Sequence, residues 1–417
     1  MASAGMSLAM CTVSSFFACS SNDPPGAGGN VVQEAGVVAD GGPPIDAPVA
    51  PPGYDGGLGL GLADVADTPC VPRGGSLAVV LAGGGDASPA APLFRSLQRA
   101  GDRRLADTAD GSGFVLFDAD GSNAKRVTAA LPAGGTTALG GQIVRGGKAA
   151  VDVAAAQSYD LTGIPAGNPV TLANEAVDGL AIGADDQSAL VVWATKNAVR
   201  GRGVTKGAAA GDGGYDLALG AIVNAPSMAV SSVKSGLFAV VFSGDDTGSR
   251  YQTAFGRGSA TARIGDPSNL FTGAMPRSVV GLARTPAGFA VLVTVADGAN
   301  PYAMLVLTDA GGHKTSAGLK LLGTREARGV AVNGSEIGVL AHRREGTAFE
   351  SRSAVEFRAF DVAGAPLGPW VCLEPPGDET ELGGGIVADG TGYAAIFRAA
   401  DGSASLARFD RLGTGAL

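Results

Sequence analysis

A short apolar strand followed by an Asp-x-x-Gly turn recurs along this chain at intervals of roughly fifty residues. The clearest copies end in the turns Asp118–Gly121, Asp309–Gly312, Asp361–Gly364 and Asp410–Gly413, and the last three aspartates are 52 and 49 residues apart. Asp is favoured at the first position of a type I turn and Gly at the fourth, so each copy has the chemistry of a hairpin. A fixed period of this length predicts a fold built from repeated units.

Weaker copies fill the gaps between the clear ones. Asp160–Gly163 keeps the Asp and the Gly, and two candidates without the Asp lie at Val204–Gly207 and Phe255–Ser259. With these included, the turns fall near residues 118, 160, 204, 256, 309, 361 and 410. The spacing therefore predicts about seven units, within a range of six to eight.

A second pattern keeps the same period. An apolar strand opens with Gly about 20 residues before a turn, and another short apolar strand precedes it. The glycines are Gly236, Gly288, Gly338 and Gly392, and the preceding strands are Met228–Val230, Val279–Leu282, Gly329–Val332 and Gly385–Ala388. The strands that open with Gly are almost entirely apolar, which indicates burial on both faces.

Each unit thus holds four short antiparallel strands, which is typical of a propeller blade. The 67 glycines, about twice the average share of roughly 7%, favour short strands joined by tight turns over helices. We therefore predict an all-β fold, a β-propeller of about seven four-stranded blades over residues 76–417. A β-sandwich is the alternative, but a sandwich has no reason to keep a period across the chain.

The last predicted blade lacks room for an outer strand because the sequence given ends at Leu417. Ser76–Ala82 is a spare apolar strand that would complete it and leave no open sheet edge. Cys70 stands just before this strand, and Cys372 ends the outer strand of the preceding unit. In an oxidising compartment we expect a Cys70–Cys372 disulfide across the closure. Two unpaired thiols are the alternative.

The first 75 residues differ from the rest. Met6–Ala18 is a 13-residue, mostly apolar run, too short to span a bilayer as a helix but suited to the core of a signal peptide. Residues 19–75 are rich in Pro, Gly, Ala and Asp, a composition that cannot offset the entropy of ordering. The expected organisation is a signal-like segment at 1–18, a disordered tether at 19–75 and a propeller domain at 76–417.

Two segments resemble known families. Phe16–Asn22 resembles a bacterial lipobox, in which a small residue, here Ala18, precedes the cysteine that receives the lipid. Phe16 departs from the usual Leu, and no Lys or Arg precedes the apolar run. The resemblance implies lipidation of Cys19 and anchoring at the outer membrane or cell surface, with a secreted protein as the alternative. Phe114–Thr128 resembles one TolB-type propeller repeat, which implies the fold and leaves the function open.

Composition excludes several functions. The net charge is −9, the pI is about 4.8, and no basic patch with interleaved aromatics exists, so nucleic-acid binding is not expected. No Gly-x-Ser-x-Gly elbow or phosphate-binding loop is present, and the sequence indicates no catalytic residue. His313 and His342 have no second metal ligand nearby in sequence. We expect both histidines to be solvated and predict neither metal nor cofactor.

The remaining hypotheses are a non-catalytic envelope protein that binds a protein or glycan, and an extracytoplasmic hydrolase or lyase acting on a glycan or ester. Residues just before the inner strands should lie at the channel mouth, and the candidates are Asp178, Arg277 and Arg328. The two arginines belong to consecutive units and would suit a carboxylate or sulfate. Solvated loop arginines are the alternative. The sequence indicates no oligomeric state.

Replacing Cys19 tests the predicted anchor. Cys19→Ala should release the protein from membranes, because stable anchoring needs the acyl chains. The matched change Cys11→Ala should leave it membrane-bound. Intact mass of the wild-type protein should show cleavage before Cys19 and added acyl chains, and a mature protein that keeps residues 1–18 would contradict the prediction.

Overall fold

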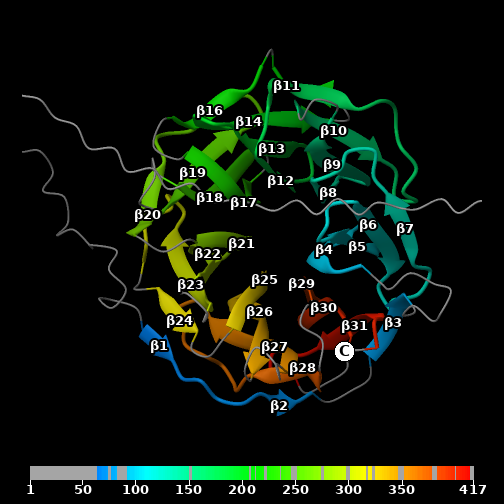
Figure 1. The fold of residues 1–417 in the computed structure, drawn as a ribbon, viewed down its shortest axis with the longest axis vertical. Coiled ribbons are helices and arrows are strands. Elements are labelled where there is room, and N and C mark those ends of the chain that lie inside the picture. The colour runs from blue at the N-terminus through cyan, green and yellow to red at the C-terminus, as the bar shows by residue number, and fades with distance from the viewer. Residues whose placement is uncertain are drawn as a thin grey trace, which may run out of the picture. The chain divides into compact units, whose positions relative to one another are not determined.

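Seven small sheets form a ring around a central channel in the unit that spans Gly53–Leu417 (Figure 1). The computed structural model describes residues 63–73, 77–81, 92–149, 153–205, 208–211, 213–219, 223–234, 236–245, 251–273, 277–296, 301–315, 318–321, 325–345, 352–377, 383–399 and 401–413. The predicted seven-bladed, all-β propeller is confirmed. The expected signal-like segment, Cys19 and the first part of the tether lie outside the described residues.

The first four blades follow one another along the chain. Blade 1 has β4 (Phe94–Ala100), β5 (Arg103–Thr108), β6 (Gly113–Asp118) and β7 (Lys125–Thr128). Blade 2 has β8 (Gly135–Leu139), β9 (Gln142–Lys148), β10 (Val153–Tyr159) and β11 (Val170–Ala176). Blade 3 has β12 (Gly179–Ala184), β13 (Ala189–Ala194), β14 (Ala198–Thr205) and a divided outer strand, β15 (Ala208–Ala209) and β16 (Tyr215–Leu219). Blade 4 has β17 (Val223–Lys234), β18 (Leu237–Asp245), β19 (Tyr251–Ser259) and β20 (Ser268–Gly273).

The last three blades each take a strand from the N-terminal side. Blade 5 has β21 (Arg277–Arg284), β22 (Gly288–Val295), β23 (Tyr302–Asp309), β24 (Leu319–Leu321) and β1 (Ala63–Val65). Blade 6 has β25 (Arg325–Asn333), β26 (Glu336–Glu345), β27 (Arg352–Asp361), β28 (Val371–Gly377) and β2 (Val71–Pro72). Blade 7 has β29 (Gly385–Asp389), β30 (Gly392–Arg398), β31 (Ala404–Phe409) and β3 (Leu77–Leu81). No helix in the described ranges is long and apolar enough to cross a membrane.

The core lies between neighbouring blades. The second strand of each blade is buried along its length, as in β13, and its side chains join clusters shared with the next blade. Aromatic pairs bridge these interfaces: Phe255 and Phe289 of blades 4 and 5 have ring centroids 5.3 Å apart. Burial on both faces explains the unbroken apolar runs of the sequence.

The Asp-x-x-Gly turns close the outer hairpins as predicted. Asp309 Oδ1 accepts the backbone N–H groups of Gly311 and His313 at 2.8 and 2.9 Å, and Asp361 repeats the pattern. Gly312 and Gly364 have φ values of 87° and 91°, which explains the glycine at the fourth position.

The turn predicted near residue 256 is wrong. β19 runs unbroken from Tyr251 to Ser259, and the hydrogen-bonded reversal follows it, from Ser259 N to Ala262 O at 2.8 Å. Gly258 serves packing, since a Cβ there would lie 2.2 Å from the Tyr215 hydroxyl. A residue without a side chain is therefore needed at position 258 for an aromatic neighbour in the adjacent blade and not for a bend.

The ring closes as predicted. β3 supplies the outer strand of blade 7 by antiparallel pairing with β31, with Leu77 opposite Ala407 and Leu81 opposite Ala404. Figure 1 shows β3 in blue beside the red strands of blade 7. One sheet thus joins the two ends of the domain, and β31 is covered by β3 on the side that faces away from β30.

The domain begins earlier than the expected boundary at residue 76. β1 pairs in parallel with β24 and β2 with β28, so residues from 63 onward extend the sheets of blades 5 and 6. We use "strap" for β1, β2, β3 and the described residues between them. The composition of this segment predicts disorder, but its backbone is ordered by the edges of sheets already formed, an effect that composition does not reveal.

Covalent and ionic bonds hold the strap to blade 6. The structure joins Cys70 and Cys372 in a disulfide with Cα atoms 5.2 Å apart. Asp67 Oδ1 lies 2.7 Å from Arg325 Nη1, and Arg325 Nε donates to Glu356 Oε2, also at 2.7 Å. Arg325 and Glu356 are fully buried, so their charges depend on each other and on Asp67.

Removing the disulfide should destabilise the closed ring. The double change Cys70→Ser with Cys372→Ser should lower the free energy of unfolding by about 5 kcal/mol, the chain-entropy value for so long a loop. Denaturant unfolding without reductant measures the loss. Val79→Thr, at a strap position that is 59% exposed, is the control and should leave the midpoint unchanged. Equal midpoints for wild type and the double variant would contradict the prediction.

Candidate functional site

The inner strands of the seven blades surround a cavity of about 1030 Å³ in the central channel. Its wall is mostly small and apolar, but polar side chains gather where the inner strands begin. They are Arg95, Ser96, Thr136, Ser227, Glu326 and Arg328. A large cavity with a few convergent polar groups is the default candidate for a binding site. We refer to this end of the channel as the channel mouth.

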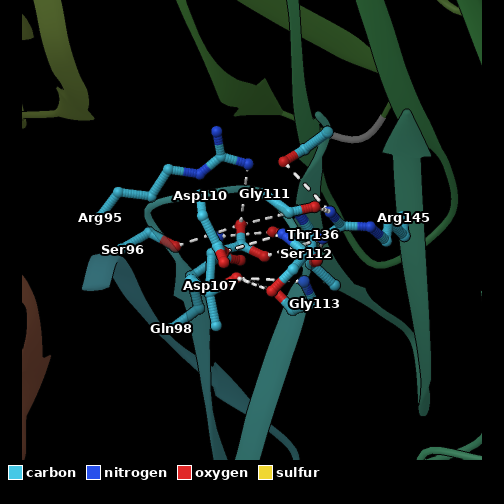
Figure 2. A network of polar contacts seen from close by, with 12 residues as sticks. Arg95, Ser96, Gln98, Asp107, Asp110, Gly111, Ser112, Gly113, Thr136 and Arg145 are labelled. Atoms are coloured by element: carbon cyan, nitrogen blue, oxygen red, sulfur yellow. Dashed lines mark hydrogen bonds and ion pairs between the residues drawn. The ribbon is translucent and has the colours of Figure 1, made fainter. Parts of the chain in front are cut away.

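Asp107 organises one side of the mouth (Figure 2). Its Oδ2 accepts the Thr136 backbone N–H at 2.8 Å and the Ser96 hydroxyl at 3.3 Å. Its Oδ1 lies 3.3 Å from Arg145 Nη1. Asp107 comes from β5 of blade 1, whereas Thr136 and Arg145 come from blade 2, so the carboxylate fixes the junction of two blades.

Arg145 is fully buried behind Asp107. Its guanidinium donates to the carbonyls of Leu131 at 2.8 Å and Gly111 at 2.5 Å, and to the Thr136 hydroxyl at 2.8 Å. Burial lowers the pKa of Arg145 and the Asp107 charge raises it in part, leaving it below the ordinary value. The arginine is therefore a structural cation, held by partners on every side and out of reach of a ligand.

Arg95 is placed differently. Its side chain is 38% exposed, and its ion pair with Asp107 is long, 3.9 Å between Nη2 and Oδ2. Figure 2 shows one terminal nitrogen directed at Asp107 and the other directed away from the network. Because Asp107 is already held by Arg145, Thr136 and Ser96, its charge is shared among several donors. Arg95 can thus present donors to the channel.

Glu326, Arg328 and His342 form a second polar group on blade 6. Arg328 Nη2 lies 2.8 Å from Glu326 Oε2 and 3.2 Å from His342 Nδ1. Glu326 and His342 face each other across β25 and β26. The Arg328 and Glu326 side chains are 28% and 19% exposed, whereas His342 is fully buried. The expectation that His342 is solvated is therefore wrong.

Glycines bring the two polar groups together across blade 7. The channel wall between them is Gly383–Gly385, and β25 of blade 6 makes contacts with β4 of blade 1 as well as with β29. A Cβ at Gly384 would lie 3.9 Å from Arg328 Cβ, and one at Gly385 would lie 2.3 Å from the Ser96 carbonyl carbon. The strands that carry Arg95 and Arg328 can therefore approach each other because the segment between them, Gly383–Gly385, has no side chains.

The charges at the channel mouth stand in pairs. Arg95 lies beside Asp107 and Arg328 beside Glu326, whereas Arg284, the third arginine of the cavity lining, is the last residue of β21 and lies at the opposite end of its strand. The mouth therefore offers two guanidinium groups, each next to a carboxylate.

Of the three residues predicted at the mouth, only Arg328 lines the channel. Asp178 is exposed before β12, and the lining of blade 3 starts two residues later, at Leu180. Arg277 is 7% exposed, lies 5.6 Å over the Phe271 ring and donates to the Tyr251 carbonyl at 3.5 Å. Burial lowers the pKa of Arg277. The predicted pair of guanidiniums is therefore not brought together.

The register of the inner strands explains why Arg277 and Arg328 do not occupy equivalent positions. Arg277 is the first residue of β21, and its counterpart in the next blade is Arg325, the first residue of β25. Both strands carry a bulge just before a glycine, Gly281 and Gly329, and these glycines align the two units. In that alignment Arg328 corresponds to a valine of blade 5. Aligning the units on their inner-strand glycines would have separated the two arginines.

Arg95, Asp107 and Glu326 were missed from the sequence. Asp107 and Arg145 stand inside the second strands β5 and β9, whose other charged residues, Arg103, Arg104 and Lys148, lie at the strand ends, and a charge inside such a strand is a signal for a buried pair. Arg95 gave no comparable signal, because β4 precedes the first recognisable turn. Among the described residues, no group of three or more His, Cys, Asp or Glu side chains is arranged to hold a metal ion.

Breaking the buried pair should destabilise the junction of blades 1 and 2. Asp107→Asn leaves the Arg145 charge uncompensated and should lower the free energy of unfolding by about 3 kcal/mol. Asp110→Asn, at an exposed turn nearby, keeps an acceptor for the Ser112 N–H and should cost under about 0.5 kcal/mol. Urea unfolding of both variants measures the difference, and equal losses would contradict a special role for Asp107.

Comparison with known proteins identifies the fold. No family model and no curated protein matches the sequence. The chain is similar to a structure of Kuenenia stuttgartiensis hydrazine synthase, with 12% identity, a TM-score of 0.51, and coverage of 78% of this chain and 98% of that one. It is also similar to the β-propeller domain of Cps50 (Swd1) from Myceliophteria thermophila, with 11% identity, a TM-score of 0.44, and coverage of 76% and 97%. At these identities the likeness shows a propeller fold alone.

Proposed function

We propose that this protein is an exported, lipid-anchored binding protein whose channel mouth holds an acidic group of a protein or glycan in the cell envelope. The observation that carries the proposal is the placement of Arg95 and Arg328 in one recess, on strands that meet over Gly383–Gly385. Guanidinium groups form paired, charge-assisted hydrogen bonds with carboxylates and sulfates.

The geometry supports binding over catalysis. His313 lies at an outer turn with Nδ1 3.2 Å from Asp309, and His342 is buried against Arg328. Asp107 accepts hydrogen bonds from two blades, so its carboxylate is held in place and is not presented to a substrate. A general base must reach the proton that it removes, which none of these three groups does.

Export is supported by the closure of the ring. Disulfides persist in oxidising compartments and are rare in the cytosol. The Cys70–Cys372 bond secures the strap whose N-terminal end leads back toward Cys19. An anchor there would tether the propeller to a membrane.

Titration with acidic probes tests the channel mouth. In calorimetry, at least one of two acidic probes, oligogalacturonate and a tetraglutamate peptide, should bind the propeller domain. The affinity should fall as the salt concentration rises. Arg95→Ala and Arg328→Ala should each weaken binding about tenfold. Arg263→Ala is the matched control, because its side chain is also 38% exposed and lies in blade 4, away from the channel. Absence of binding, or equal losses in all three variants, would refute the proposal.

A further inference from the structure

A second cleft lies between blades 2 and 3, outside the channel. It has a volume of about 410 Å³ and is bounded by β11 on one side and by β14 and Gly213–Gly214 on the other. The cleft exists because the outer strand of blade 3 is divided: β15 pairs with one end of β14 and β16 with the other. The side chain of Trp193, from the second strand of the blade, is thereby left at the floor.

The floor carries a hydrogen-bond donor without a partner. Trp193 is 1% exposed, and its indole Nε1 has no hydrogen-bond acceptor among the described residues. A buried N–H that is left unsatisfied is costly, and such a group in a native protein requires an explanation. Gly214 lies directly over the ring, since a Cβ there would be 2.7 Å from Trp193 Cη2. Position 214 therefore has room for a glycine only, where the cleft meets the indole ring.

The walls carry polar groups whose charges are already balanced. Arg200 Nη1 lies 2.6 Å from Glu175 Oε1, and Arg200 Nε lies 2.7 Å from Asp216 Oδ1. The Arg202 guanidinium donates to three backbone carbonyls, those of Leu172, Ala210 and Gly211. Among the residues that the structure describes here, two cations are therefore matched by two carboxylates, and the side chains are held in fixed positions. A charged ligand gains little here.

We propose that this cleft binds a neutral carbohydrate. Sugar hydroxyls can donate to the second oxygen of Glu175, and a hydroxyl or ring oxygen can accept from Trp193 Nε1. The cleft thus offers an acceptor and a donor, and every sugar hydroxyl can act as both. The volume lies within the range of small-molecule sites and suits one or two sugar rings. This site is separate from the acidic-ligand site of the channel.

Intrinsic fluorescence gives a direct readout, because the chain has only two tryptophans. Methyl glycosides of glucose, galactose, mannose, fucose and N-acetylglucosamine are titrated into the wild-type protein. At least one should shift the emission saturably, with a Kd on the order of 1 mM, typical of a weak small-ligand site. Trp193→Phe should abolish the shift and Trp370→Phe should retain it, since Trp370 lies in blade 6.

Calorimetry with Glu175→Ala keeps the test independent of the fluorophore. This variant should bind the same glycoside about tenfold more weakly, whereas Asp266→Ala, which removes another carboxylate paired with an arginine, should bind like wild type. Arg328→Ala should also bind the glycoside normally, so failure of the channel proposal would not affect this one. The proposal is overturned if no glycoside binds wild type saturably, or if Glu175→Ala and Asp266→Ala are equivalent. A water alone on Nε1 in a glycoside-soaked crystal would likewise overturn it.

Discussion

The backbone pairing of β3 with β31 is the interaction on which the rest of the molecule depends, because it turns a row of sheets into a ring. Blade 7, which it completes, stands between the two arginines of the channel mouth. Arg95 lies on blade 1 and Arg328 on blade 6, and only a closed blade 7 holds their strands in contact over Gly383–Gly385. The geometry of the candidate site is therefore a consequence of closure, and no single blade could supply it.

Buried arginines fix which blades are neighbours. Arg145 of blade 2 pairs with Asp107 of blade 1, and Arg104 of blade 1 pairs with Asp389 of blade 7. Burial lowers the pKa of Arg104, as it does that of Arg145, so both cations depend on their carboxylates. Buried ion pairs contribute little net stability compared with apolar contacts, but losing one partner is costly. The buried ion pairs raise the free energy of any arrangement in which neighbouring blades are shifted. The apolar second strands provide most of the stabilising contacts between blades.

The sequence predicts the fold well because a blade is a local object. Each local feature is recognisable within a few residues: the turn aspartates, the apolar second strands and the spare strand at 76–82. The period of about fifty residues then predicts how many blades there are. The site is less predictable because it depends on where units meet. Arg328 lines the channel, whereas its pairing with Arg277 depends on the register of two bulged strands. The role of a glycine can also depend on another blade. Gly258 suggests a turn in the sequence, but the residue is required to be small by Tyr215 of the adjacent blade.

The strap also determines which outer edges remain open. β1 and β2 cover the outer strands of blades 5 and 6, and β3 is itself the outer strand of blade 7. The described residues place no strap strand on blades 1 to 4, and the cleft at Trp193 lies between two of these. Within the described residues, the strap therefore secures three neighbouring blades and adds no strand to the opposite arc. The two proposed sites are compatible with this arrangement, because the channel is lined by inner strands and the cleft at Trp193 lies between blades that carry no described strap strand.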